Sequence, residues 1–165
     1  RLDAESIRDA LLLVGGKLDL AAGGANIKEG TKSEYGYEFD SPRRSVYLPV
    51  FRNTLPEIFE TFDFADPNIQ IGSRSSSTIA PQALLMMNSP FVIGQSEAAA
   101  KTLLKRSEMT TRERINHVYL QVVGRLPSDR EIGLAKRFID EGKTDTSWQM
   151  FYQALFQSID FRYLK

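Results

Sequence analysis

The sequence predicts a mainly α-helical domain, in which an N-terminal helix and a bundle of three C-terminal helices surround a central irregular region. Apolar residues recur at helical spacing near both ends of the chain, while proline and glycine interrupt the middle. One or two short strands are expected there. With 165 residues, 42% of them hydrophobic, the chain is long enough for a real core, so residues 1–165 are expected to form a single domain.

The first helix is expected to begin after Asp3 and to end at Gly15-Gly16, a pair that stops helices. Its apolar positions follow helical spacing and are Ala4, Ile7, Ala10, Leu11 and Val14. Because the helical pattern starts at once and no methionine opens the chain, we expect a piece of a longer, multi-domain protein.

A long excursion follows between Lys17 and Asp40, rich in glycine and charge, and loops of this length are usually binding elements or disordered. Tyr35, Tyr37 and Phe39 alternate within it, which favours a short strand. Residues 42–52 also alternate, but a central proline removes a backbone donor, so an edge strand or extended segment fits best.

Three helices are predicted in the middle of the chain. Pro56 opens a short one over residues 57–61. Pro81 occupies a first-turn position before an apolar run, which predicts a short buried helix that ends at Asn88. Pro90 restarts the chain as a longer helix that reaches Arg106.

Three amphipathic helices are predicted in the last third, and their short connections favour a bundle. The first covers residues 110–124, with threonine at its start and glycine at its end. The second covers residues 128–142 and opens with the capping box Ser-Asp-Arg-Glu. Ser147 is expected to cap the last helix, whose aromatic stripe begins at Trp148.

Composition excludes several classes of function. Basic and acidic residues both number 21, so no global field favours nucleic acid. The absence of cysteine, with a single histidine, excludes thiolate zinc sites, iron–sulfur clusters, disulfides and covalent haem, and we expect neither a metal nor a cofactor in this segment. No apolar run approaches the roughly 18 residues of a membrane span. The oligomeric state stays open.

Polar groups concentrate between Phe62 and Phe91. Asp63 and Asp66 are one candidate pair, because two neighbouring carboxylates can act as general acid and base or bind a hard cation. The alternative is that both cap adjacent turns and pair with arginine, a common role for aspartate beside proline. A calcium-loop spacing starts at Asp66 but lacks the closing acid, where Ser77 stands.

Four arginines complete the candidate cluster, since guanidinium groups match carboxylate, sulfate and phosphate oxyanions. The alternative is that they bridge the polar turn to the helices. The full set of candidate site residues is Arg43, Arg44, Arg52, Asp63, Asp66, Arg74, Thr78, Gln82 and Asn88.

Other patterns favour structural roles. His117 lies near the apolar stripe of its helix, which is typical of a packing residue. Met86 and Met87 occupy an apolar run and are expected in the core rather than as haem ligands. The serine run that begins at Ser73 lacks the G-x-S-x-G elbow of a nucleophile.

Long collinear motifs resemble a known family. They are RLDAESIRDALL, GGKLDLAAGG, PRRSVYLPVFRNTLPEIFETFDFADPN, RSSSTIAPQALLMMNSPFV, VYLQVVGRLPSDRE and LFQSIDFRYL. Together they cover nearly the whole chain and resemble the C-terminal domain of the bacterial family of unknown function DUF1553, which is expanded in planctomycetes. The resemblance implies an exported, extracytoplasmic multi-domain protein with a cytochrome c-like module elsewhere, and it implies no activity.

Two function hypotheses follow. The first is a non-catalytic structural or interaction module that docks neighbouring domains of the same parent protein through the arginine-rich and acidic turn region. The second is an enzyme or binding domain for an anionic or carbohydrate-like ligand, which would use the candidate acids and arginines, with Tyr35 and Tyr37 as stacking surfaces. Mutually paired, buried acids and arginines favour the first hypothesis, and unpaired carboxylates in an open cleft favour the second.

Overall fold

The computed structural model describes residues 1–142 and 145–164, and this part of the chain is mainly helical. Within them the eight α-helices are α1 (Ala4–Val14), α2 (Glu57–Thr61), α3 (Ala80–Asn88), α4 (Pro90–Leu104), α5 (Thr111–Val123), α6 (Asp129–Gly142), α7 (Asp145–Gln157) and α8 (Ile159–Arg162). A short 3-10 helix, η1, covers Ser45–Tyr47.

The helix ends confirm several predicted caps. Asp3 accepts the Ser6 N–H at 2.8 Å at the start of α1. Thr110 and Glu113 form a capping box at the start of α5, and Gly124 ends that helix in the left-handed region with φ +68°. Local sequence therefore fixes where these helices begin and end.

The predicted strands are wrong for the described part of the chain, which contains an isolated bridge between Asp19 and Arg43 in their place. Residues 35–39 form turns and irregular backbone, in which Tyr37 and Phe39 pack edge-to-face with ring centroids 5.0 Å apart. Tyr37 and Phe39 thus pack in a local aromatic cluster instead of on one face of a sheet, and Tyr35 is 73% exposed.

Residues 45–47 turn into η1 because a distant acid captures their backbone. Ser45 donates its backbone N–H at 2.8 Å and its hydroxyl at 2.6 Å to Asp9 Oδ1 on α1. The buried Arg8 guanidinium donates to the carbonyl oxygen of Arg43 at 3.0 Å. These side chains supply the partners that a neighbouring strand would otherwise provide.

Two further expectations are corrected in the helices. Ser147 does not cap the last long helix, because α7 already begins at Asp145 and Ser147 is buried inside it. Met86 is fully buried in the core, but Met87 is 49% exposed, since neighbouring residues of a helix point about 100° apart. A short helix, α8, follows α7, and its Ser158 cap accepts the Phe161 N–H at 3.2 Å.

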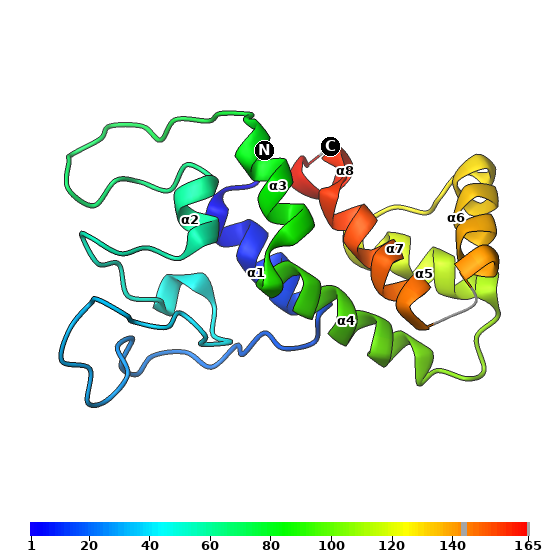
Figure 1. Cartoon of the computed structure of the whole chain (residues 1–165), viewed down its shortest axis with the longest axis horizontal. Helices are drawn as coiled ribbons and strands as arrows, with labels where there is room; N and C mark the ends of the chain where they lie inside the picture. Colours follow the sequence, from blue (N-terminus) through cyan, green and yellow to red (C-terminus); the bar gives the residue numbers. More distant parts are fainter. Residues whose placement is uncertain (143–144, 165) are drawn as a thin grey trace.

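Most of the helices lie at one end of the molecule, and the long loops gather at the other (Figure 1). Helix α7 packs against α4, α5 and α6 and contributes the buried rings of Trp148, Phe151, Tyr152 and Phe156. Helix α1 joins this core through α4 and also packs on α2 and η1. The long loops therefore extend from the side of the helices on which α1 lies.

Candidate functional site

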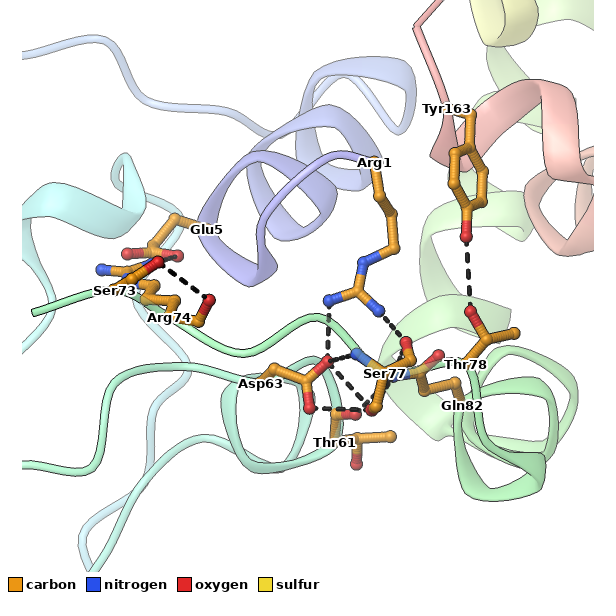
Figure 2. A network of polar contacts seen from close by, with 10 residues as sticks. All are labelled: Arg1, Glu5, Thr61, Asp63, Ser73, Arg74, Ser77, Thr78, Gln82 and Tyr163. Carbon is orange, nitrogen blue, oxygen red and sulfur yellow. Dashed lines mark hydrogen bonds and ion pairs between the residues drawn. The ribbon is translucent and has the colours of Figure 1, made fainter. Parts of the chain in front are cut away.

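The segment after α2 and the segment before α3 meet at one carboxylate (Figure 2). Ser77 donates its backbone N–H at 2.8 Å to Oδ2 of Asp63 and its hydroxyl at 2.8 Å to Oδ1. Arg1 adds an ion pair of 2.7 Å to Oδ2 and also donates to the Ser77 carbonyl oxygen. One acid thus joins three segments that lie far apart in the sequence.

The backbone of Asp63 is held in the left-handed region, with φ +59°, where glycine is the usual residue. It follows Phe62, the C-cap residue directly after α2, and the next N–H, from Phe64, returns to the Phe59 carbonyl oxygen at 3.1 Å. This is the Schellman ending of a helix, in which glycine commonly occupies the left-handed position. An aspartate here combines the turn with a carboxylate aimed at Ser77 and Arg1.

Gln82 on α3 lies beneath the same carboxylate and is only 1% exposed. Its amide nitrogen donates to the carbonyl oxygens of Thr61 at 3.1 Å and of Ser77 at 3.2 Å. Its Oε1 has no hydrogen-bond partner among the described residues. The amide nitrogen of Gln82 therefore connects the end of α2 to the start of α3.

The environment keeps Asp63 ionised. Burial raises the pKa of its carboxyl, but the hydrogen bonds from the Ser77 N–H, the Arg1 guanidinium and the Ser77 hydroxyl lower it further, so the net pKa lies below the ordinary value. Side-chain exposure is 15% for Asp63 and 8% for Arg1, so the pair is largely shielded from water. A carboxylate with this lowered pKa and these partners is a structural acceptor and a poor general base at neutral pH.

Arg74 reaches α1 from the same loop. Its guanidinium forms a 2.8 Å ion pair with Glu5 and lies 4.8 Å above the ring of Phe64. Phe64 in turn stacks on Phe59, with ring centroids 4.7 Å apart and planes 11° from parallel. Arg74 thus attaches the loop to α1 at a second point, and it does not contact Asp63.

Asp66 lies outside this arrangement, although sequence placed it beside Asp63. Asp66 is exposed. Its Oδ1 accepts two hydrogen bonds from Asn68, one from the backbone N–H at 2.8 Å and one from the side-chain amide at 3.1 Å. The same Asn68 amide donates to the Arg52 carbonyl oxygen at 3.0 Å. Asp66 therefore shapes its own turn.

The remaining candidates are dispersed. Arg43 stacks on Tyr47 at 4.3 Å and donates to carbonyl oxygens of the long loop, including that of Ala25 at 3.0 Å. The guanidinium groups of Arg44 and Arg52 are exposed, and neither has an ion pair or hydrogen bond within the described residues. The other two candidates are Thr78, whose hydroxyl lies 3.4 Å from that of Tyr163, and Asn88, whose amide donates to the Leu84 carbonyl oxygen at 3.0 Å.

Two hollows flank the candidate residues. A groove of about 360 Å³ lies between the start of α1, η1 and the two stacked phenylalanines, and it includes Glu5, Asp9 and Arg44. Glu5 and Asp9 are engaged by Arg74 and Ser45, respectively. A cavity of about 450 Å³ lies between α5 and α8 and includes Arg125 and Tyr163. Across residues 1–142 and 145–164, no group of three or more acidic or histidine side chains is arranged to hold a metal ion.

Sequence reasoning missed two polar centres. Arg1 gave no signal, because its partner Asp63 lies 62 residues away. Arg125 binds Glu131 at 2.7 Å and Asp160 at 2.6 Å, and so joins α5, α6 and α8. Only the capping-box position of Glu131 was visible in the sequence.

One comparison with known proteins gives a match. The family described as "PSD1: Protein of unknown function (DUF1553)" matches residues 1–139. No curated protein and no solved structure matches the chain. The family match thus ends within α6, before α7 and α8.

Proposed function

Because this chain belongs to the DUF1553 family, whose description assigns no function, we propose from its own geometry that it is a non-catalytic structural or interaction module. The observation that carries this is the pairing of Asp63, whose two carboxylate oxygens receive donors from Ser77 and Arg1. An acid with these partners holds neighbouring helices together. The same holds for Arg74 and Arg43, whose guanidinium groups bind groups of this chain.

The surface that we propose for a partner is the segment around η1. Arg44 and Arg52 extend into solvent there, and Val46 and Val50 are 68% and 46% exposed. A cationic rim with apolar side chains between suits a partner surface that is acidic and partly apolar. We name Arg44, Val46, Val50 and Arg52 the η1 face.

We propose as the partner a neighbouring domain of the same multi-domain, exported parent protein, and we propose that the domain acts outside the cytoplasm. Within the described residues, no helix has both the length and the apolar character needed to cross a bilayer. The module would accordingly act by fixing the position of its neighbour.

The test uses the parent protein's adjacent domain, expressed separately and titrated calorimetrically with this domain. The double variant Arg44→Glu/Arg52→Glu reverses the charge of the η1 face and is expected to weaken binding at least about tenfold. The matched control is Arg130→Glu/Arg137→Glu, two exposed arginines of α6, which should leave the affinity unchanged. Equal effects of the two double variants would refute the η1 face as the docking surface.

The second hypothesis, an enzyme or binding domain for an anionic or carbohydrate-like ligand, makes a different prediction. It requires Asp63, Asp66 and the arginines Arg43, Arg44 and Arg74 to converge on a ligand, whereas each lies with its own partner or in solvent. Turnover of such a ligand by this domain, lost in Asp63→Asn while the fold persists, would overturn the non-catalytic proposal.

A further inference from the structure

A cluster of basic side chains lies where α4 passes into α5, away from the Asp63 site. Arg106, just beyond α4, places Nη1 3.4 Å from Nε2 of His117. Arg114, one turn before His117 on α5, donates from Nη2 to the Arg106 carbonyl oxygen at 3.0 Å. Arg106 thus lies within hydrogen-bond reach of His117 through its side chain and of Arg114 through its backbone carbonyl.

This cluster has no acidic counterpart among the described residues. No carboxylate forms an ion pair or hydrogen bond with Arg106, Arg114 or His117 there. The acids nearest in sequence are Glu108, which is exposed and forms no ion pair with the cluster within the described residues, and Glu113, which accepts the backbone N–H and hydroxyl of Thr110 at 2.8 and 2.7 Å. The Nε atom of Arg114 is buried and has no acceptor within the described residues. Positive charge therefore accumulates without compensation.

The position on α5 adds to this field. Arg114 lies in the first turn of a 13-residue helix, whose N-terminus carries a partial positive charge that falls off within that turn, and His117 lies in the second turn. Arg106 approaches the same turns from the preceding loop. Two guanidinium groups, an imidazole and a helix start are the groups that proteins use to bind anions.

We propose that Arg106, Arg114 and His117 form a binding site for a tetrahedral oxyanion, a sulfate or a phosphate group. Guanidinium forks match the oxygen spacing of such groups, and the anion would supply the negative charge that the cluster lacks. The site is independent of the η1 face and of the Asp63 site.

The proposal predicts a dependence on pH. Arg106 faces the imidazole, Arg114 lies one turn earlier on the same helix and contacts the Arg106 carbonyl oxygen, and Tyr152 of α7 lies within the field of Arg106. Burial, and then the charge of Arg106, lower the pKa of His117 below its ordinary value. Protonated imidazole donates from both nitrogens, so anion binding strengthens as the pH falls through the pKa of His117. A bound anion in turn raises that pKa.

His117 is the single histidine of the chain, so its imidazole proton resonances report on the site without overlap. Proton NMR spectra are recorded during titration with sodium sulfate and, separately, sodium phosphate, with sodium chloride at matched ionic strength as the reference. We expect a saturable shift with either oxyanion and an increase in the apparent pKa of His117. A response to sulfate but not phosphate, or the reverse, identifies which group the site selects.

Arg106→Gln is the main variant, because Arg106 is exposed and its replacement leaves the core untouched. Loss of one charge-assisted contact is expected to lower the oxyanion affinity about tenfold. Arg114→Gln should act in the same direction. Arg112→Gln is the matched control on α5, since Arg112 pairs at 3.5 Å with Asp129 instead, and it should keep the affinity of the parent chain.

Two results would overturn the site. A shift that grows linearly with salt and is equal in chloride would indicate screening or an adventitious ion only. An equal loss of affinity in Arg106→Gln and Arg112→Gln would show that net charge, and not this cluster, attracts the anion. Circular dichroism of each variant checks that the helical content is unchanged.

Discussion

Ser77 donates both its backbone N–H and its hydroxyl to the carboxylate of Asp63, at 2.8 Å each. Because Asp63 follows α2 and Ser77 precedes α3, this pair closes the loop of residues 64–76 at its base. Arg1 pairs with the same acid and adds the start of α1. The loop between the two residues is long, but its ends are fixed.

Asp63→Ala is expected to destabilise the fold by about 2 kcal/mol, since it removes a shielded acceptor and leaves the Arg1 guanidinium and Ser77 donors unpaired. Asp63→Asn should cost less, because asparagine tolerates the left-handed backbone and still accepts from Ser77. Chemical denaturation measures both free energies of unfolding. Asp66→Ala is the control and should cost less than about 1 kcal/mol, as Asp66 shapes only an exposed turn. Equal costs for Asp63→Ala and Asp66→Ala would contradict the role assigned to Asp63.

Acid is expected to weaken the junction of α5, α6 and α8. Hydrogen bonds from Arg125 lower the pKa of Glu131 from 4.5 to about 2, despite partial burial. A carboxyl whose folded pKa is depressed contributes stability that is complete above its unfolded pKa, so this contribution is lost as the pH falls from 4.5 toward 2. Thermal unfolding across this range measures the loss.

Glu131→Gln should flatten that pH dependence and cost about 1 kcal/mol at neutral pH, a modest value because Arg125 is about a third exposed and solvent screens the pair. Asp129→Asn is the control on the same helix, since its side chain is 97% exposed. If Glu131→Gln retains the acid sensitivity of the parent chain, another carboxyl is responsible for it.

Gly15→Ala is expected to destabilise the chain by about 1–3 kcal/mol through overpacking. A Cβ at this position would lie 2.5 Å from Oε1 of Gln95 and 3.3 Å from its Cα, so the buried Gln95 side chain would have to move and the α4 backbone would have to shift by a few tenths of an ångström. The free energy of unfolding is again the measurement. Gly133→Ala is the matched control, because nothing lies within 4 Å of its added methyl group, and alanine there should stabilise α6 by about 1 kcal/mol. A neutral Gly15→Ala would show that this helix contact is loose.

The helices were predictable because their signals are local. Asp3, Thr110 and Ser128 cap helices through partners three residues away, and Gly124 ends one through its own backbone. The strand predicted around Ser45 failed because its backbone is captured by Asp9, 36 residues earlier. Periodicity records which side chains are apolar, but it does not record where a backbone donor finds its acceptor.

The same difference between local signals and long-range contacts applies to the candidate site. Sequence placed Asp63 and Gln82 in one polar cluster, and the structure brings both against Ser77. Asp63 and Asp66 were predicted as a pair because they are near in sequence. In the structure, the backbone turns at the left-handed residue Asp63, and the two side chains contact different partners. A non-glycine residue with positive φ leaves no mark in a single sequence.

The segment beyond the family match carries a decisive share of the core. Phe156 on α7 is fully buried, and its ring lies 5.2 Å from Phe161 of α8. Phe156→Ala is expected to destabilise the chain by about 3–5 kcal/mol, because it leaves a cavity where α7 meets the rest of the body. Denaturant unfolding followed by far-UV circular dichroism provides the measurement. Met150→Ala, at a position of α7 that is 52% exposed, is the matched control and should cost well under about 1 kcal/mol. Similar small costs for both variants would mean that residues 1–139, the family match, hold the fold without α7.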